Sequence, residues 1–259
     1  MLNLLERVKG RWRRRRNGRV PIPDDVVHKA RRANDAFFSM LGVDQQAVRR
    51  RHRELSAALG LRTDDDESVH RLAFTALQMS GFDPANILEL GTLHGEATIH
   101  LATLFPRATI HTVELPADDP LLATWHGDSA KRDADMTARF APHANIRQIR
   151  ANTFDLPALD LPCFDLVWLD AGHHYPEVAW DHAYCLGRLR AGGWLLSDDI
   201  MVPDGRDPAL RNEDFAPFRV IEYVKARKPW ANGLLLKREN PKRYLQNRKY
   251  IAWFHKSVA

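Results

Sequence analysis

Two segments in the second half of the sequence concentrate side chains that can hold a cation or move a proton. The segment FDLVWLDAGHHYPEV contains Asp170, His173 and His174, and the segment GGWLLSDDI contains Asp198 and Asp199. Carboxylate oxygens suit Mg²⁺ or Mn²⁺, and an imidazole can accept a proton near neutral pH. The plainer alternatives are a helix cap for Asp170, a solvated turn for Asp198 and Asp199, and a structural role for His174.

A glycine-containing segment earlier in the chain has the features of a ligand-binding loop. In ILELGTLHGEAT, the residues Glu89, Gly91 and Gly95 give the spacing E-x-G-x-x-x-G where an apolar run meets a helical pattern. A glycine there lets the backbone approach a ligand, and the start of a helix offers free N–H groups. The dinucleotide fingerprint needs glycine where this chain has Leu93, so the loop is not predicted to hold NAD.

An acidic residue stands at the end of the next apolar run. The segment IHTVELP places Glu114 there, 23 residues after Gly91. In nucleotide-binding α/β folds an acid at this location accepts hydrogen bonds from both hydroxyls of a ribose. Because a phosphate loop is missing, the combination indicates a nucleoside without phosphates, and S-adenosylmethionine fits that description.

The apolar pattern indicates which elements must hold these residues. Apolar residues recur at helical spacing over residues 24–80, and after Pro84 short apolar runs alternate with helical stretches. We therefore predict an α/β fold, a doubly wound, mostly parallel seven-stranded sheet with a helical N-terminal cap. A helix is expected over Phe215–Lys228. Strands are expected at Asn86–Leu90, Thr109–Glu114, Ile146–Arg150, Phe164–Leu169, Trp194–Ser197, Gly233–Lys237 and Lys249–Phe254.

In such a sheet the chemical residues belong to one place. Ligands of open α/β sheets bind beyond the carboxyl ends of the strands. The glycine loop, Asp170, Asp198 and Asp199 each follow an expected strand. We therefore expect the carboxylates and His173 to converge beside the glycine loop.

Composition and length bound the class of protein. The chain has 259 residues, of which 44% are hydrophobic and 27% charged, as in a globular protein. No apolar run reaches the roughly 18 residues of a spanning helix, and the basic cluster Arg11–Arg16 replaces a signal cleavage site. We expect a cytoplasmic protein with Cys163 and Cys185 reduced. The expected divisions are a basic segment 1–20, a helical cap 21–83 and a cofactor-binding domain 84–259.

Charge is unevenly distributed along the chain. Residues 1–20 hold eight Lys or Arg against one Glu, and residues 225–259 hold ten against one, although the whole chain has a net charge of only +5. The central body is therefore acidic, which argues against a nucleic-acid partner. Residues 1–20 could form a basic amphipathic helix that contacts an anionic membrane surface, or a solvated tail.

From Pro84 to Lys256 the sequence resembles the class I S-adenosylmethionine-dependent methyltransferases, which have a Rossmann-like fold. The resemblance implies that the loop after the first strand cradles the methionine end of the cofactor, through Glu89, Gly91, Thr92 and Gly95. It also implies that Glu114 binds the ribose and that Asn152, after the third strand, faces the adenine.

The D-x-x-H-x-Y segment and the GG-x-x-x-x-DD turn narrow the resemblance to bacterial O-methyltransferases. This branch modifies sugars of macrolides, aminocoumarins and polysaccharides and includes cephalosporin-hydroxylase-like proteins. In its metal-dependent members the equivalents of Asp170, Asp198 and Asp199 hold a divalent cation, so Mg²⁺ or Mn²⁺ is expected here. A further Asp that some members use as the base is Gly172 in this chain, which leaves His173 as the expected base beside Asp170.

Three functions are open at this stage. The first is methyl transfer to a hydroxyl of a sugar, saccharide or sugar-bearing small molecule. The second is methylation of a phenolic or carboxylate small molecule. The third is a non-catalytic accessory subunit that binds the cofactor, which the acidic set disfavours because a binding module has no need of it. A homo-oligomer is expected in any of these cases.

Overall fold

The computed structural model describes residues 24–61, 69–122, 129–203, 215–237 and 249–258. The basic segment 1–20, with its predicted membrane contact, lies outside the described residues. No helix in the described part of the chain combines the length and apolarity needed to cross a membrane.

Seven strands form one sheet in the order β3-β2-β1-β4-β5-β7-β6. The first five strands run parallel, and β7 pairs antiparallel with both β5 and β6. The glycine loop therefore leaves the sheet at its centre, between β2 and β4. The strands are β1 (Asn86–Leu90), β2 (Thr109–Glu114), β3 (Ile146–Arg150), β4 (Phe164–Leu169), β5 (Leu189–Ile200), β6 (Ala231–Leu236) and β7 (Tyr250–His255).

The predicted fold class is confirmed. The first four expected strands have the same bounds in the structure, and the last two differ by one or two residues at each end. The fifth strand is longer than expected, because pairing with β4 lengthens its start and pairing with β7 lengthens its end. The expected last helix is present as α9 (Ala216–Arg227).

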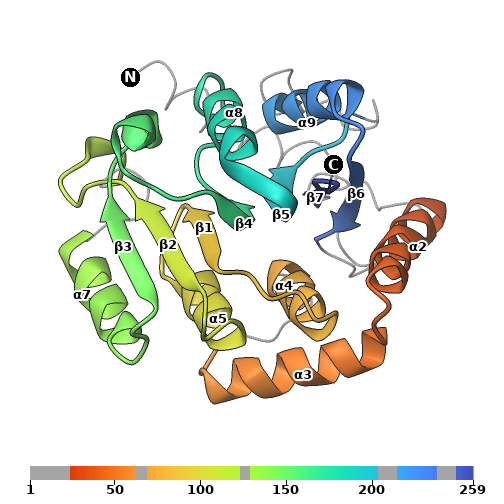
Figure 1. Cartoon of the computed structure of the whole chain (residues 1–259), viewed down its shortest axis with the longest axis horizontal. Helices are drawn as coiled ribbons and strands as arrows, with labels where there is room; N and C mark the ends of the chain where they lie inside the picture. The colour runs from red at the N-terminus through yellow and green to blue at the C-terminus, as the bar shows by residue number, and fades with distance from the viewer. Residues whose placement is uncertain (1–23, 62–68, 123–128, 204–214, 238–248, 259) are drawn as a thin grey trace, which may run out of the picture.

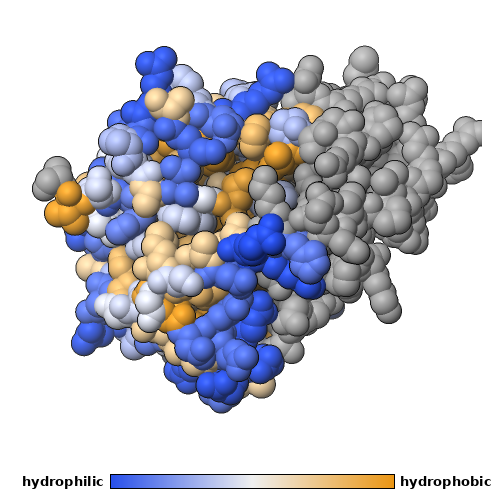
Figure 2. All heavy atoms as spheres, turned by 90° about the vertical axis from the view of Figure 1, so that its right-hand side faces the viewer, coloured by the Kyte–Doolittle hydropathy of each residue, from blue (hydrophilic) through white to orange (hydrophobic). Residues whose placement is uncertain are grey.

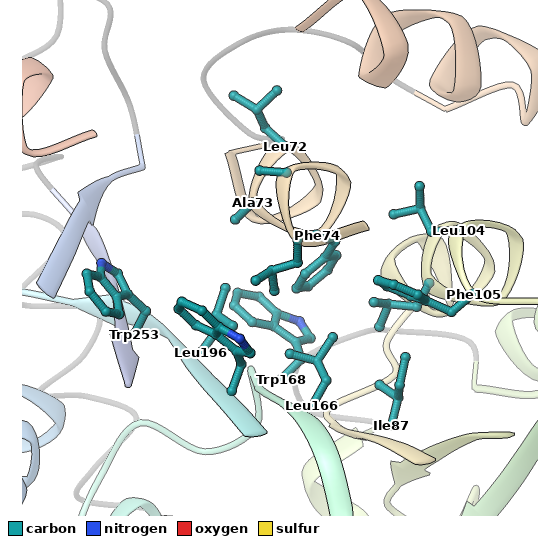
Figure 3. Close-up of a cluster of buried hydrophobic side chains, with 14 of the residues drawn as sticks. Leu72, Ala73, Phe74, Ile87, Leu104, Phe105, Leu166, Trp168, Leu196 and Trp253 are labelled. Atoms are coloured by element: carbon teal, nitrogen blue, oxygen red, sulfur yellow. The ribbon is translucent and has the colours of Figure 1, made fainter. Parts of the chain in front are cut away.

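Both faces of the central strands β1 and β4 are buried, as expected for nearly continuous apolar strands. On β4, Leu166 and Trp168 face one core, and Val167 and Leu169 face the other. Figure 3 shows Trp168 with Phe74 and other side chains of the first core. The strands are thus held rigidly from both sides, and only their ends are available for a ligand.

Helices from the N-terminal part and from between the early strands cover the first face (Figure 1). They supply Phe37, Val48, Phe74 and Leu101 to its core. The other face is covered by α8 (Glu177–Arg188) and α9, which contribute Cys185 and Ile221. The helices of the first face are α2 (Asp24–Met40), α3 (Gln45–Ala58), α4 (Val69–Met79), α5 (Glu96–Leu104) and α7 (Ser129–Phe140).

Local signals set the bounds of α3, the long helix at the bottom of Figure 1. The Asp44 side chain accepts a hydrogen bond from the Ala47 N–H at 2.7 Å, which caps the first turn. Gly60, at φ +64°, lies just beyond the last turn, where a left-handed residue ends a helix at low cost.

The helix α2 lies along the outer strand β6. Asn34 Nδ2 donates to the Leu236 carbonyl at 3.3 Å, and the Leu236 N–H donates to Asn34 Oδ1 at 2.7 Å. Figure 2 views the molecule from this side, where hydrophilic residues surround a band of hydrophobic ones. These two hydrogen bonds fix α2, the first described helix, to β6, a strand near the end of the chain.

Candidate active site

The glycine loop begins where the carboxyl ends of the neighbouring parallel strands β1 and β4 lie side by side. The Gly91 N–H donates to the Val113 carbonyl at 2.9 Å, and the Asp170 N–H donates to the Leu90 carbonyl at 2.8 Å. Gly91 has φ +95°, and a Cβ placed on it would lie 2.3 Å from the Asp170 carbonyl oxygen. The two expected halves of the site, the glycine loop and the acidic segment, therefore touch through their backbones.

This contact gives a direct stability prediction. Gly91→Ala should lower the free energy of unfolding by at least about 2 kcal/mol, because the added methyl group meets fixed backbone and the residue must keep a left-handed conformation. Gly187→Ala is the matched control, since a Cβ there meets nothing within 4 Å inside α8. Urea unfolding of both variants measures the difference, and equal stability of the two would contradict the predicted clash.

Glu89 lies at the centre of a buried polar network under the loop. Its Oε2 accepts hydrogen bonds from Thr98 at 2.5 Å and from Thr112 at 2.7 Å, and the Thr92 and Thr112 hydroxyls are 2.6 Å apart. Burial raises the pKa of Glu89 to about 7, against these hydrogen bonds and with a further rise from Glu114. Glu89 Oε1 is buried without a hydrogen-bond partner among the described residues. That oxygen is a suitable acceptor for a polar ligand group.

Glu114 reaches from the end of β2 to the glycine loop. One carboxylate oxygen accepts a hydrogen bond from the Leu93 N–H at 2.7 Å, and the other accepts one from the Leu115 N–H at 3.0 Å. Each oxygen of an ionised carboxylate can accept a second hydrogen bond. The residue therefore stands beside the loop, as expected, with acceptor capacity left for hydroxyl groups.

The segment after β3 is a short 3₁₀ helix, η1 (Thr153–Ala158), and Asn152 is its N-cap residue. Asn152 Oδ1 accepts from the Phe154 N–H at 3.0 Å, so this side chain caps η1. Trp180 of α8 donates from Nε1 to the Thr153 carbonyl at 2.9 Å and packs against the Phe154 ring. The aromatic pair, which the sequence analysis did not select as a site, fixes this segment beside α8.

Asp170, His173 and Asp199 come together at the carboxyl ends of β4 and β5. His173 Nε2 is 3.7 Å from Asp170 Oδ1 and 3.7 Å from Asp199 Oδ2. His174 follows on the same turn, where its backbone carbonyl accepts from the Val178 N–H at 2.9 Å. The imidazole between the two acids is that of His173, the residue that the sequence selected.

Two lysines that the sequence analysis missed complete this cluster. Lys237 Nζ pairs with Asp198 Oδ2 and lies 3.0 Å from Asp199 Oδ1, and Lys249 Nζ pairs with Asp199 Oδ2. A signal was present, because the two residues ended and began adjacent expected strands. An antiparallel pair of strands brings such ends together, here at the edge where β4 and β5 end.

The charges of the cluster control its protonation. Burial raises the pKa of Asp170 well above its usual range, and Asp198 adds to the rise. Burial lowers the pKa of His173, although Asp199 and Asp198 attract its charged form. Despite burial, Lys237 and Lys249 hold the pKa of Asp199 well below its usual range. The cluster therefore presents a neutral imidazole beside an ionised, lysine-bound carboxylate.

As arranged, this donor set does not fit the expected divalent cation. Ammonium groups hold three oxygens of Asp198 and Asp199, which are the oxygens that a cation would need. In the described part of the chain, no three His, Cys, Asp or Glu side chains converge to hold a metal ion. Metal assistance stays a prediction.

Comparison with known proteins adds an independent observation. Residues 88–200 match the family described as "Methyltransferase domain". Residues 88–200 thus have the sequence pattern of a methyltransferase domain. The matched residues run from β1 to the end of β5 and so include the glycine loop and both acidic segments. The resemblance to class I methyltransferases that the sequence analysis identified is thereby confirmed.

Individual relatives of the methyltransferase domain agree. Catechol O-methyltransferase B of Danio rerio is 31% identical over 136 residues, which are 48% of this chain and 46% of that protein. The match thus spans about half the length of that relative. The O-methyltransferase of Bacillus cereus in complex with SAH has a TM-score of 0.54 at 18% identity, over 81% of this chain and 91% of the other. TomG of Streptomyces achromogenes, in complex with SAM, has a TM-score of 0.52 at 19% identity, over 88% and 99%.

Proposed function

We propose that the protein binds S-adenosylmethionine and transfers its methyl group to a hydroxyl oxygen of a small acceptor. The observation that carries the proposal is the contact between Gly91 and Asp170, which sets a cofactor-type loop beside an acid–base cluster. The methyltransferase family match supports it. So do the two solved structures of the same fold, one in complex with SAH and the other in complex with SAM.

The cofactor residues are proposed on the geometry of the loop. The polar network of Glu89 with its unpaired Oε1, and the side-chain-free surface of Gly91, suit the amino-acid end of the cofactor. Glu114 would accept the ribose hydroxyls, and Asn152 lies where the adenine is expected. Thr92 and Gly95 would act through the shape of the loop, because the Thr92 hydroxyl is engaged with Thr112.

Bound S-adenosylmethionine supplies an electrophilic methyl group on a sulfonium. A hydroxyl is a poor nucleophile until it loses its proton, so a base within reach accelerates the transfer. His173 Nε2 would take that proton, and the ionised Asp199, 3.7 Å away, would stabilise the resulting imidazolium. Asp170, also 3.7 Å from Nε2, would help to orient the ring. The oxygen then bonds to the methyl carbon as the carbon–sulfur bond breaks.

Two acceptor classes are proposed. The proposal of a sugar hydroxyl as acceptor rests on the D-x-x-H-x-Y and paired-Asp motifs. The phenolic hydroxyl is favoured by the relative named catechol O-methyltransferase. Transfer of labelled methyl to a panel of monosaccharides and catechols separates the two classes, and transfer to neither on cofactor-bound protein supports the accessory subunit instead.

Cofactor binding is the first test of the proposal. Calorimetry should show micromolar affinity for S-adenosylmethionine and S-adenosylhomocysteine, roughly −8 kcal/mol. Glu114→Ala should weaken both about tenfold or more, because ribose hydroxyls lose a charged acceptor. Glu222→Ala is the control, since Glu222 pairs with Lys225 on the exposed face of α9. No heat with either ligand on folded protein would remove the assignment.

A further inference from the structure

The ends of the β6–β7 pair hold two ammonium groups at a fixed separation. Lys237 follows β6 directly and Lys249 precedes β7 directly, and the Lys237 N–H donates to the Lys249 carbonyl at 2.9 Å. The ladder of the two strands therefore extends through both residues. Backbone pairing, and not side-chain flexibility, sets where the two lysines stand.

The strand β5, which pairs with β7, is irregular beside Lys237 and Lys249. Ser197 is opposite Ala252 and Ile200 is opposite Tyr250, so the register shifts by one residue at Asp198 and Asp199. Asp199 has φ +57°, a left-handed conformation that is uncommon for residues other than glycine. An extra residue in one strand redirects side chains, and such bulges are frequent beside active sites. Here the bulge directs both consecutive carboxylates toward Lys237, and Asp199 also toward Lys249.

Burial distinguishes these ion pairs from ordinary surface pairs. The Asp198 side chain is 2% exposed and that of Lys237 is 13% exposed, whereas the Lys225–Glu222 pair is 38% and 46% exposed. A charge removed from water requires a matched partner, and removing that partner is strongly destabilising. The lysines therefore neutralise the charge of these carboxylates, as a bound metal cation does in other proteins.

We propose that Lys237 and Lys249 are the resident cations of the acidic cluster, occupying three of the four carboxylate oxygens of Asp198 and Asp199 so that the site is complete without a divalent metal. The inference rests on the proposed function for the role of the site. Its central measurement, metal binding, needs no methyl transfer and so tests it separately. The two lysines act as positioning residues, because both hold Asp199, one of the two acids that flank His173.

Manganese is a suitable probe, because Mn²⁺ prefers the oxygen ligands that this cluster would offer and is visible by electron paramagnetic resonance. The wild-type full-length chain should leave added Mn²⁺ in its free, hydrated form. The Lys237→Met, Lys249→Met double variant should bind Mn²⁺ at least about tenfold more tightly than wild type, because its carboxylates lose their partners. Lys225→Met is the control for loss of an ion-paired lysine and should resemble wild type.

The matched charge-retaining variant is Lys237→Arg, which should bind no more Mn²⁺ than wild type. If the double variant does not fold, Lys249→Met alone and the wild-type titration still decide the question. Stoichiometric Mn²⁺ binding by wild type would overturn the proposal, as would loss of methyl transfer on exhaustive chelation that Mg²⁺ or Mn²⁺ restores. Absence of S-adenosylmethionine binding would instead overturn the proposed function.

Discussion

Replacing His173 with alanine should lower the turnover of methyl transfer by about 100-fold or more, the range expected for loss of a general base. The imidazole is the side chain that stands between Asp170 and Asp199, 3.7 Å from each. Affinity for S-adenosylmethionine should remain nearly intact, because the glycine loop and Glu114 belong to other strand ends. Steady-state turnover and calorimetry on the same preparation separate the two effects.

The neighbouring His174 supplies the matched control for this experiment. It is the same residue type one position along the turn, and its described contact is made by its backbone. His174→Ala should leave turnover nearly unchanged. Full activity of His173→Ala together with a large loss in His174→Ala would transfer the role of base to His174 and refute the present assignment.

A second large effect is expected in acid, from the buried His52 on α3. Burial lowers the pKa of His52 to about 4, and nearby Arg71, Arg49 and Arg53 add to the shift. The unfolded chain, with an ordinary pKa of 6.5, therefore binds more protons than the folded chain between these values. Protonation of His52 should lower the free energy of unfolding by about 3 kcal/mol as the pH falls from 8 to 4. This loss is absent well above pH 6.5, where His52 is neutral in both the folded and the unfolded chain.

Buried acids shift stability in the opposite direction. The pKa of Glu89 is raised to about 7 and that of Asp181 to about 6, both chiefly by burial, so each favours folding as the pH falls. Total acid sensitivity thus does not report one group, whereas the difference between His52→Gln and wild type does. Urea unfolding at pH 8 and pH 4 should show a smaller pH effect in the variant by that 3 kcal/mol. His28→Gln, which removes an exposed histidine, should retain the wild-type difference.

Much of the sheet was predictable because its strands are buried on both faces. An apolar run such as Phe164–Leu169, followed by Asp and Gly, has little alternative to a central parallel strand, and β4 has those bounds. The fifth strand was predicted too short at both ends. Its polar residues Arg190, Asp198 and Asp199 lie outside the apolar run, yet pairing with β4 and β7 extends the strand through them.

The site was predictable in its location but not in its electrostatics. The carboxyl-end rule alone predicts that residues after β1, β4 and β5 meet. The counter-ions of Asp198 and Asp199 depended on which side chains the outer strands present, and Lys237 and Lys249 looked like ordinary charges at strand ends. Only the register of β5 with β7, including its one-residue shift, determines that these four side chains meet.

Polar residues in the glycine loop illustrate the same difference. The sequence selected Thr92 as a cofactor contact, and the structure engages its hydroxyl with Thr112 of β2, over Glu89. A threonine beside a binding loop is equally suited to both roles in sequence terms. Which role prevails depends on the distance to a neighbouring strand, and a linear pattern does not contain that distance.

The contact between Asn34 and Leu236 has a consequence for association. An outer strand with free N–H and C=O groups is a template for pairing with another chain, which leads to aggregation. The Asn34 amide offers one donor and one acceptor, so it imitates a neighbouring strand residue and satisfies both groups of Leu236. During synthesis, β6 is completed about 200 residues after Asn34, and until then α2 cannot pack against β6. Nascent chains are thus most prone to self-association before the last two strands are made.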